Sequence, residues 1–269
     1  MNVRARADSG VVTSGGPGAD RRDGLATLGP FFAVQSHDAG SAPDAGWRPF
    51  SDLVDVPEVL RTRVDAARAV LAAGRPIETI EIRVAASVVH LGLAARLLSP
   101  LLALAALHDL DHVPALSDIR WRDTLGGVVP LSLPHPLLEG PAPAHPDWDR
   151  WATDLVAGPL ADVSRAVAAL TPSAHTRRGN IASAVHGAVT VLSNAVPDRR
   201  AAGPAERSRT LGRLLLDRPE LRAAAGGEPG TSAFRRRNCC LIYRAAEPAR
   251  PATIRTARPI CGDCVLTAP

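Results

Sequence analysis

The sequence predicts an α+β protein that is mainly helical, with a helical body, a small antiparallel sheet and a cysteine-rich segment near the carboxyl end. Apolar residues make up 46% of the 269 residues but aromatic residues only 3%, so the core must consist of Ala, Leu and Val. Ala and Leu favour helices, whereas strands favour β-branched and aromatic residues. Several long stretches also repeat apolar residues at helical spacing, and all four cysteines lie within one short segment.

The composition divides the chain into three parts. Residues 1–23 are rich in Gly, Asp and Arg and predict a disordered N-terminal tail. Residues 24–225 form the predicted body, and residues 233–269 form the cysteine-rich segment. Between them, GGEPGTSA (226–233) is expected to be a flexible joint.

The first half of the body predicts a helix over 56–74, because its apolar residues share one face and Gly74 is a natural stop. The run 84–98 is apolar nearly all round, as in a central core helix. Pro100 predicts a break or kink near Ser99, followed by a second helix over 101–108. The short stretches 28–36 and 76–83 fit either a helix or a strand.

The second half begins with two expected strands, DIRWR and VVPLSL (within 118–133), which predict a hairpin around Gly126 and Gly127. The Pro-rich stretch 133–149 is expected to be a linker. Three helical stretches follow. They occupy 147–170, 171–196 and 205–226. The first is expected to kink at Gly158-Pro159, the second to have Asn180 as its N-cap, and the third to have a break before Pro219.

Charge and hydropathy exclude several classes of protein. The net charge of +4 comes from 31 arginines, without lysine, against 27 acids scattered among them. Because neither a basic stripe interleaved with aromatics nor a reading module is visible, nucleic acid is not an expected partner. The most apolar run, 84–107, is interrupted by His90, Arg96 and Pro100, so a transmembrane segment is not expected. The N-terminus has no signal-peptide pattern, which predicts a cytoplasmic protein.

The cysteines are Cys239 and Cys240, side by side in RRRNCCLIYR, and Cys261 and Cys264 in CGDC. In a reducing compartment, clustered thiols indicate a metal or a cluster, and a Cys-x-x-Cys turn brings two sulfurs to one metal ion. Adjacent cysteines can serve the same site only where the backbone turns. A [2Fe–2S] cluster, a structural zinc ion, and inert or disulfide-bonded thiols all remain open on these residues alone.

RRRNCCLIYR and CGDCVL resemble the carboxyl-terminal segment of the FhuF-like ferric-siderophore reductases, and VAASVVHLGLAARLLSP, DIRWR and RRGNIASAVHGA resemble the body of that family. The resemblance implies that Cys239, Cys240, Cys261 and Cys264 hold a [2Fe–2S] cluster. In the family the two cysteine pairs are about ten residues apart, and here twenty. The excess, AAEPARPATIRTARP (245–259), resembles a surface insertion, which costs little entropy to close.

The implied function is cytoplasmic, one-electron reduction of a ferric hydroxamate-type siderophore in the 24–225 body, which releases Fe(II). Hard anionic oxygens bind Fe(III) much more tightly than Fe(II), so a one-electron donor is sufficient for release. No G-x-G-x-x-G or Walker A pattern in a suitable context supplies a nucleotide site. The electrons are therefore expected from a ferredoxin or flavoprotein reductase. Between 235 and 264 the sequence has seven arginines and two acids, a net charge of 7 − 2 = +5. This charge could attract an acidic electron carrier, or the arginines could simply be solvated.

Substrate contacts are expected from His90 and Arg96 in the apolar run and from Arg177, Arg178 and Asn180 before a predicted helix start. Arginine and asparagine can bind exposed chelate oxygens, and a helix N-terminus favours anionic ligands. Each of these residues also has a structural interpretation: a core histidine, an ion pair or a cap.

Two other functions fit part of the pattern. The protein could be a non-enzymatic iron–sulfur or zinc protein, acting as a redox sensor or an assembly partner. The body also resembles part of the siderophore synthetases, but that function needs an ATP site that the sequence does not show.

Overall fold

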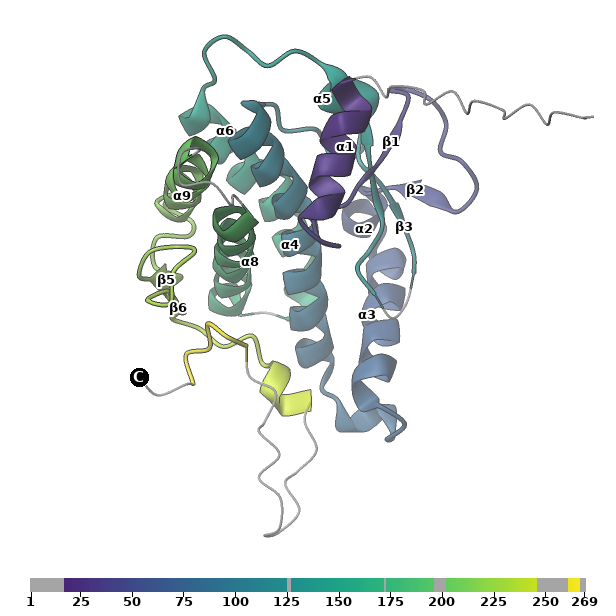
Figure 1. Ribbon diagram of the computed structural model, residues 1–269. Helices are drawn as coiled ribbons and strands as arrows, with labels where there is room; N and C mark the ends of the chain where they lie inside the picture. Colours follow the sequence, from purple (N-terminus) through teal and green to yellow (C-terminus); the bar gives the residue numbers. More distant parts are fainter. Residues whose placement is uncertain (1–16, 125–126, 172, 196–201, 246–260, 267–269) are drawn as a thin grey trace, which may run out of the picture.

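A computed structural model describes residues 17–124, 127–171, 173–195, 202–245 and 261–266. Helices dominate, and a small sheet lies on one side of them (Figure 1). The predicted mainly helical α+β fold is therefore confirmed. The helices of the body are α1 Pro17–Thr27, α2 Asp52–Asp55, α3 Pro57–Ala72, α4 Ile82–His108, α5 His135–Glu139, α6 Trp148–Leu155, α7 Ala161–Ala166, α8 Ala174–Ala195 and α9 Ala202–Leu216.

Helix α4 is the centre of the body and packs against α3, α8 and α9 (Figure 1). It runs unbroken through Pro100, so the predicted break near Ser99 is wrong. Proline removes one helical hydrogen bond, but Leu97, Leu98 and Leu101 around it are at most 2% exposed. Burial on the neighbouring helices therefore outweighs the local cost. By length and apolarity α4 could also cross a membrane, but 78% of its most apolar window is buried inside the body.

The sheet has the strand order β1-β4-β3-β2. The expected hairpin is present, because β3 and β4 pair antiparallel with Trp121 opposite Leu131. The sheet is nevertheless mixed rather than purely antiparallel, because β1 pairs in parallel with β4. The chain passes through α2, α3 and α4 between these two strands, and such long crossovers permit parallel pairing. The strands are β1 Gln35–His37, β2 Trp47–Pro49, β3 Arg120–Arg122 and β4 Leu131–Pro134.

Two segments are more regular than the sequence predicted. Helix α1 begins at Pro17, so the expected disorder of residues 1–23 is wrong over 17–23; residues 1–16 lie outside the described residues. The guanidinium of Arg21 donates to the carbonyls of Leu138 and Gly140, and Leu25 is fully buried. The expected linker after β4 likewise begins with α5, whose Leu138 is buried in the core.

The stretch after α6 bends where expected. Gly158 has φ −95° and ψ −109° within a π-helical turn, η2 (Val156–Leu160), and α7 follows. Pro159 cannot donate a backbone hydrogen bond, which explains the kink at this point. Asn180, by contrast, is not an N-cap: α8 begins six residues earlier, at Ala174, and Asn180 lies fully buried within it.

The cysteine-rich segment packs against the body at the ends of α4 and α8 where these helices begin (Figure 1). Its strand β6 (Arg235–Arg236) pairs with β5 (Ala225–Gly226), and the 3₁₀ helix η5 (Ile242–Ala245) follows the first cysteine pair. Ala245 packs on Ala72, Ile80 and Val84. The expected joint is a close turn in which Gly227 has φ +80°, a conformation that favours glycine. Most of the predicted 245–259 insertion lies outside the described residues.

Candidate metal centre

The four cysteines come from two arms of the chain, and one sulfur of each arm lies next to the other. Cys239 and Cys240 lie between β6 and η5, and Cys261 and Cys264 lie in a turn closed by a Cys264 N–H to Cys261 carbonyl bond of 3.1 Å. The Sγ atoms of Cys240 and Cys261 are 3.5 Å apart. None of these four described cysteines forms a disulfide in this structure.

Hydrogen-bond donors point at three of the four sulfurs. The Leu241 N–H donates to Cys239 Sγ at 3.3 Å, and the Leu266 N–H donates to Cys264 Sγ at 3.4 Å. The guanidinium of Arg236 donates to Cys261 Sγ. Because these donors stabilise sulfur in its anionic form, the arrangement suits thiolates that bind a metal.

Arg236 connects both arms to the body and is only 1% exposed. Its Nε lies 3.2 Å from the buried Asp263 Oδ2, and its backbone N–H donates to the Asp263 carbonyl. Its Nη1 donates to Asn180 Oδ1 at 3.4 Å. Burial alone would lower the pKa of Arg236, but the charges of Asp263 and the neighbouring thiols outweigh it and raise that pKa. Arg236 therefore remains a cation inside the protein.

A second set of buried polar groups runs from α4 to the adjacent cysteines. Ser87 donates through Oγ to the Cys240 carbonyl at 2.8 Å, and Asn180 Nδ2 donates to the Ser87 carbonyl at 2.9 Å. Asn180 Nδ2 also lies 3.4 Å from His90 Nδ1, while His90 Nε2 is 2.9 Å from Ser164 Oγ. These bonds connect α4, α7 and α8 to the first cysteine arm, with every member inside or at the edge of the core.

Burial controls the protonation of the site. It lowers the pKa of His90 to about 3, with a smaller contribution from Arg177, so His90 is neutral at physiological pH. Burial also raises the pKa of Cys261 to about 12, although Arg236 acts in the opposite direction. Cys239 shows the same upward direction of its pKa from burial. These thiols would therefore lose their protons when a cation compensates the charge, as in metal binding.

Two of the four sulfurs have the spacing expected for ligands of one metal ion. In a tetrahedral thiolate site with metal–sulfur bonds of about 2.3 Å, two sulfurs on one metal are about 3.8 Å apart; the Cys240–Cys261 separation of 3.5 Å is close to this. Across the described residues, three or more His, Cys, Asp or Glu side chains do not converge on one point. A [2Fe–2S] cluster requires two thiolates on each iron, so Cys239 and Cys264 are the residues that could serve a second iron.

The other residues expected at the site fall into three groups. Asn180 and His90 belong to the buried polar chain rather than to a surface. Arg96 donates to the carbonyls of Val129, Phe31 and Ala33 inside the body, so it has a structural role in place of the expected substrate contact. Arg177 and Arg178 line a cavity of about 300 Å³ beside α8.

Sequence reasoning missed Ser87, Arg236 and Asp263 as individual site residues. Arg236 was treated only as one charge among seven, and Ser87 only as part of an apolar helix. For Asp263 the sequence did contain a signal, namely its position within CGDC. An acid between two expected ligands must lie close to the site that they form. Gly179 is a fourth case: a Cβ there would lie 3.4 Å from Asn238, so α8 approaches the cysteine arm closely.

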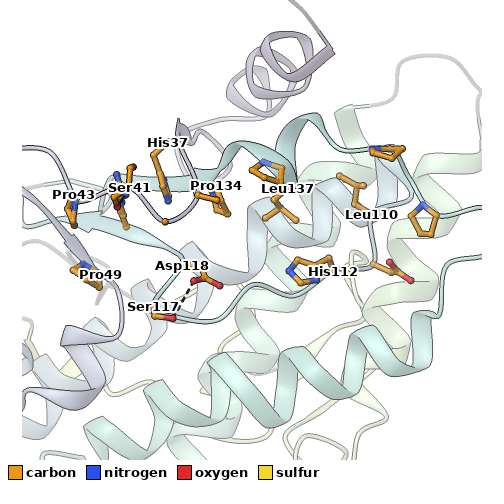
Figure 2. A pocket seen from close by; sticks show the side chains of 17 residues that line it. His37, Ser41, Pro43, Pro49, Leu110, His112, Ser117, Asp118, Pro134 and Leu137 are labelled. Atoms are coloured by element: carbon orange, nitrogen blue, oxygen red, sulfur yellow. Dashed lines mark hydrogen bonds between the residues drawn. The ribbon is translucent and has the colours of Figure 1, made fainter.

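Another cavity, of about 610 Å³, lies away from the cysteines. Figure 2 shows its wall, with His37, His112 and Asp118 around a rim rich in proline. It lies beyond the carboxyl end of α4, whereas Ser87 near the start of α4 contacts the cysteine arm. The helix between Ser87 and His108 spans about 30 Å at about 1.5 Å per residue. Because electron tunnelling falls exponentially with distance, this cavity is a poor position for a substrate reduced at the cysteines.

The chain matches no family model, no curated protein and no solved structure in these comparisons.

Proposed function

We propose that the protein is a cytoplasmic ferric-siderophore reductase that uses a [2Fe–2S] cluster held by Cys239, Cys240, Cys261 and Cys264. The observation that carries this proposal is the approach of Cys240 and Cys261 from two arms, together with N–H or guanidinium donors on three of the four sulfurs. The resemblance of both arms to FhuF-like reductases supports the same conclusion. When bound, the cluster supplies single electrons at low potential.

The chain's own residues would position the sulfurs and adjust their electronic environment. Arg236 donates to Cys261 Sγ, and positive charge near a cluster stabilises its reduced, more anionic form. The Leu241 and Leu266 N–H groups act in the same direction on Cys239 and Cys264. Ser87 and Asn180 fix the first arm on α4 and α8, so a rigid body sets the positions of Cys239 and Cys240.

The surface around the second arm suits an electron donor. Val265 and Leu266, directly after Cys264, are 42% and 54% exposed. Arg235 and Arg237 are also exposed on the other arm. A small apolar contact with nearby cations fits an acidic ferredoxin or flavoprotein reductase, because complementary charge accelerates association. The substrate, a ferric hydroxamate-type siderophore, would accept one electron and release Fe(II).

The test begins with protein purified anaerobically from iron-replete cells. We expect two irons and two acid-labile sulfides per chain, and an EPR signal after reduction. Adding a ferric hydroxamate under anaerobic conditions should abolish that signal, while a chromogenic chelator captures one Fe(II) per electron. Cys240→Ser should lose the sulfide and the activity, whereas Arg61→Gln on the exposed face of α3 should keep both.

Two outcomes would refute the proposal. A colourless protein that contains zinc and no sulfide would favour the structural-zinc alternative. A cluster-loaded protein whose EPR signal is unchanged by ferric hydroxamates, and which yields no Fe(II), would favour a redox sensor or assembly partner.

A further inference from the structure

A cavity of about 300 Å³ opens beside the start of α8, on the side of the molecule where the buried polar chain ends. Ser164 lines this cavity and its Oγ is also the partner of His90. Three arginines and one glutamate surround it: Arg165, Arg177, Arg178 and Glu220. The rest of the wall is apolar, built from small and aliphatic residues.

The three arginines differ in their partners and in their exposure. Arg165 pairs with Asp162 on its own helix. Within the described part of the chain, neither Arg177 nor Arg178 forms an ion pair with a carboxylate. Arg177 is half-buried and donates to the Thr171 carbonyl at 2.6 Å, whereas Arg178 is exposed. Burial, followed by the charge of Arg178, lowers the pKa of Arg177.

Because Arg177 and Arg178 both line the cavity and neither has a carboxylate partner among the described residues, an anion that enters the cavity can bind them. Arg guanidinium groups bind carboxylates through paired, charge-assisted hydrogen bonds. Glu220 lines the same cavity and limits the attraction to a single negative group, because its carboxylate would repel a second one. At about 300 Å³ the cavity is at the small end of ligand sites and fits one arm of a larger ligand.

The cavity is also adjacent to the cysteines. Arg178 precedes Gly179, whose added Cβ would lie 3.4 Å from Asn238, and Asn238 precedes Cys239 directly. An arm held at Arg177 and Arg178 therefore leaves the remainder of its ligand beside the cysteine segment. The 610 Å³ cavity offers no such proximity.

We propose that Arg177 and Arg178 bind a free carboxylate of the ferric chelate, so that the preferred substrates are hydroxamate chelates that carry such a carboxylate. This inference rests on the proposed reductase function for the identity of the ligand. Three hydroxamates neutralise Fe(III), so a simple tris-hydroxamate complex is uncharged. The arginines then select for the additional negative group and place the metal toward the cysteines.

Gallium(III) complexes test the cavity without any electron transfer, because Ga(III) resembles Fe(III) in charge and size but is not reduced. The probes are the Ga(III) complex of a carboxylate-bearing hydroxamate chelator and the same complex with that carboxylate converted to an amide. Calorimetric titration of the full chain, purified anaerobically, should show tighter binding of the carboxylate form. Arg178→Gln should weaken that binding about tenfold and leave the amide form unchanged.

Two further variants sharpen the result. Glu220→Gln removes the opposing carboxylate and should strengthen binding of the carboxylate complex a few-fold. Arg61→Gln changes the net charge equally on the exposed face of α3 and should have no effect. Equal binding of the two probes, or equal losses in Arg178→Gln and Arg61→Gln, would overturn the inference. Charge-dependent gallium binding in a protein that lacks labile sulfide would support the cavity while refuting the reductase.

Discussion

The buried pair between Arg236 and Asp263 should be worth several kcal/mol to the attachment of the cysteine segment. Arg236→Met leaves the Asp263 carboxylate without its cation, at 5% exposure. Removing one partner of a buried ion pair costs about 3–5 kcal/mol.

The destabilisation caused by Arg236→Met should be confined to the cysteine-rich segment. Arg236 and Asp263 belong to the two cysteine arms, and Arg236 also donates to Asn180 in the body. Hydrogen exchange of the anaerobic protein should therefore show faster exchange over 233–245 in Arg236→Met, with α4 and α8 unchanged. Iron and sulfide content should fall in parallel, because Cys261 loses its donor.

A double-mutant cycle separates the pair from other effects of the substitution. Arg236→Met with Asp263→Asn removes both charges, and the double variant should regain at least about 2 kcal/mol relative to the sum of the single changes. The matched control is Arg61 with Asp65, at 3.0 Å but with side chains 55% and 43% exposed. Its coupling should stay below about 1 kcal/mol. Additive effects of Arg236→Met and Asp263→Asn would show that this pair does not hold the arms.

Two more predictions follow from the body and its joint. His90 has a pKa of about 3 in the folded protein against about 6.5 unfolded, so stability present above pH 6.5 is lost as the pH falls; from pH 7.5 to 5.5 the loss should be about 1.4 kcal/mol. Urea titrations should show that loss reduced in His90→Gln, and an unchanged slope would refute buried neutrality. Gly227→Ala places a Cβ against the Ala233 carbonyl at φ +80°, so thermal denaturation should show a loss of at least about 1 kcal/mol. Gly92→Ala, with open space around its Cβ in α4, should instead be neutral or stabilising by up to about 1 kcal/mol.

The regular parts of the fold could be predicted because local chemistry decides them. The 56–74 helix, the hairpin of DIRWR and the kink at Gly158-Pro159 all depend on apolar spacing and on glycine or proline within a few residues. Pro100 was mispredicted for the converse reason. The cost of a proline inside a helix can be read from the local sequence. The packing of α4 on α3, α8 and α9 offsets that cost, but it comes from residues far away in the chain.

Asn180 shows the same limit within the candidate site. A Gly-Asn pair before an apolar run is a sound N-cap pattern, but the partners that hold Asn180 inside α8 are Ser87, His90 and Arg236, between 56 and 93 residues distant in sequence. The motif therefore pointed to a residue that matters, but Asn180 matters for its buried hydrogen bonds and not as a helix cap. The assignment of the cysteines to a metal stays a prediction, and it depends less on the rest of the chain, because thiols clustered in one segment indicate a metal by themselves.

The contact between α8 and the cysteine segment explains why a short segment would need so large a body. Residues 233–245 and 261–266 are two short stretches of chain, and an isolated segment of this size cannot bury enough surface to order itself. The body supplies what is missing: Ser87 and Asn180 hold the Cys240 arm, and Arg236 brings the Cys261 arm to the same place. The positions of the sulfurs are thus set by helices that contain no cysteine. Changes at Ser87 or Asn180 should therefore alter the properties of the bound metal without touching a ligand, which is a consequence that the cysteine pattern alone does not contain.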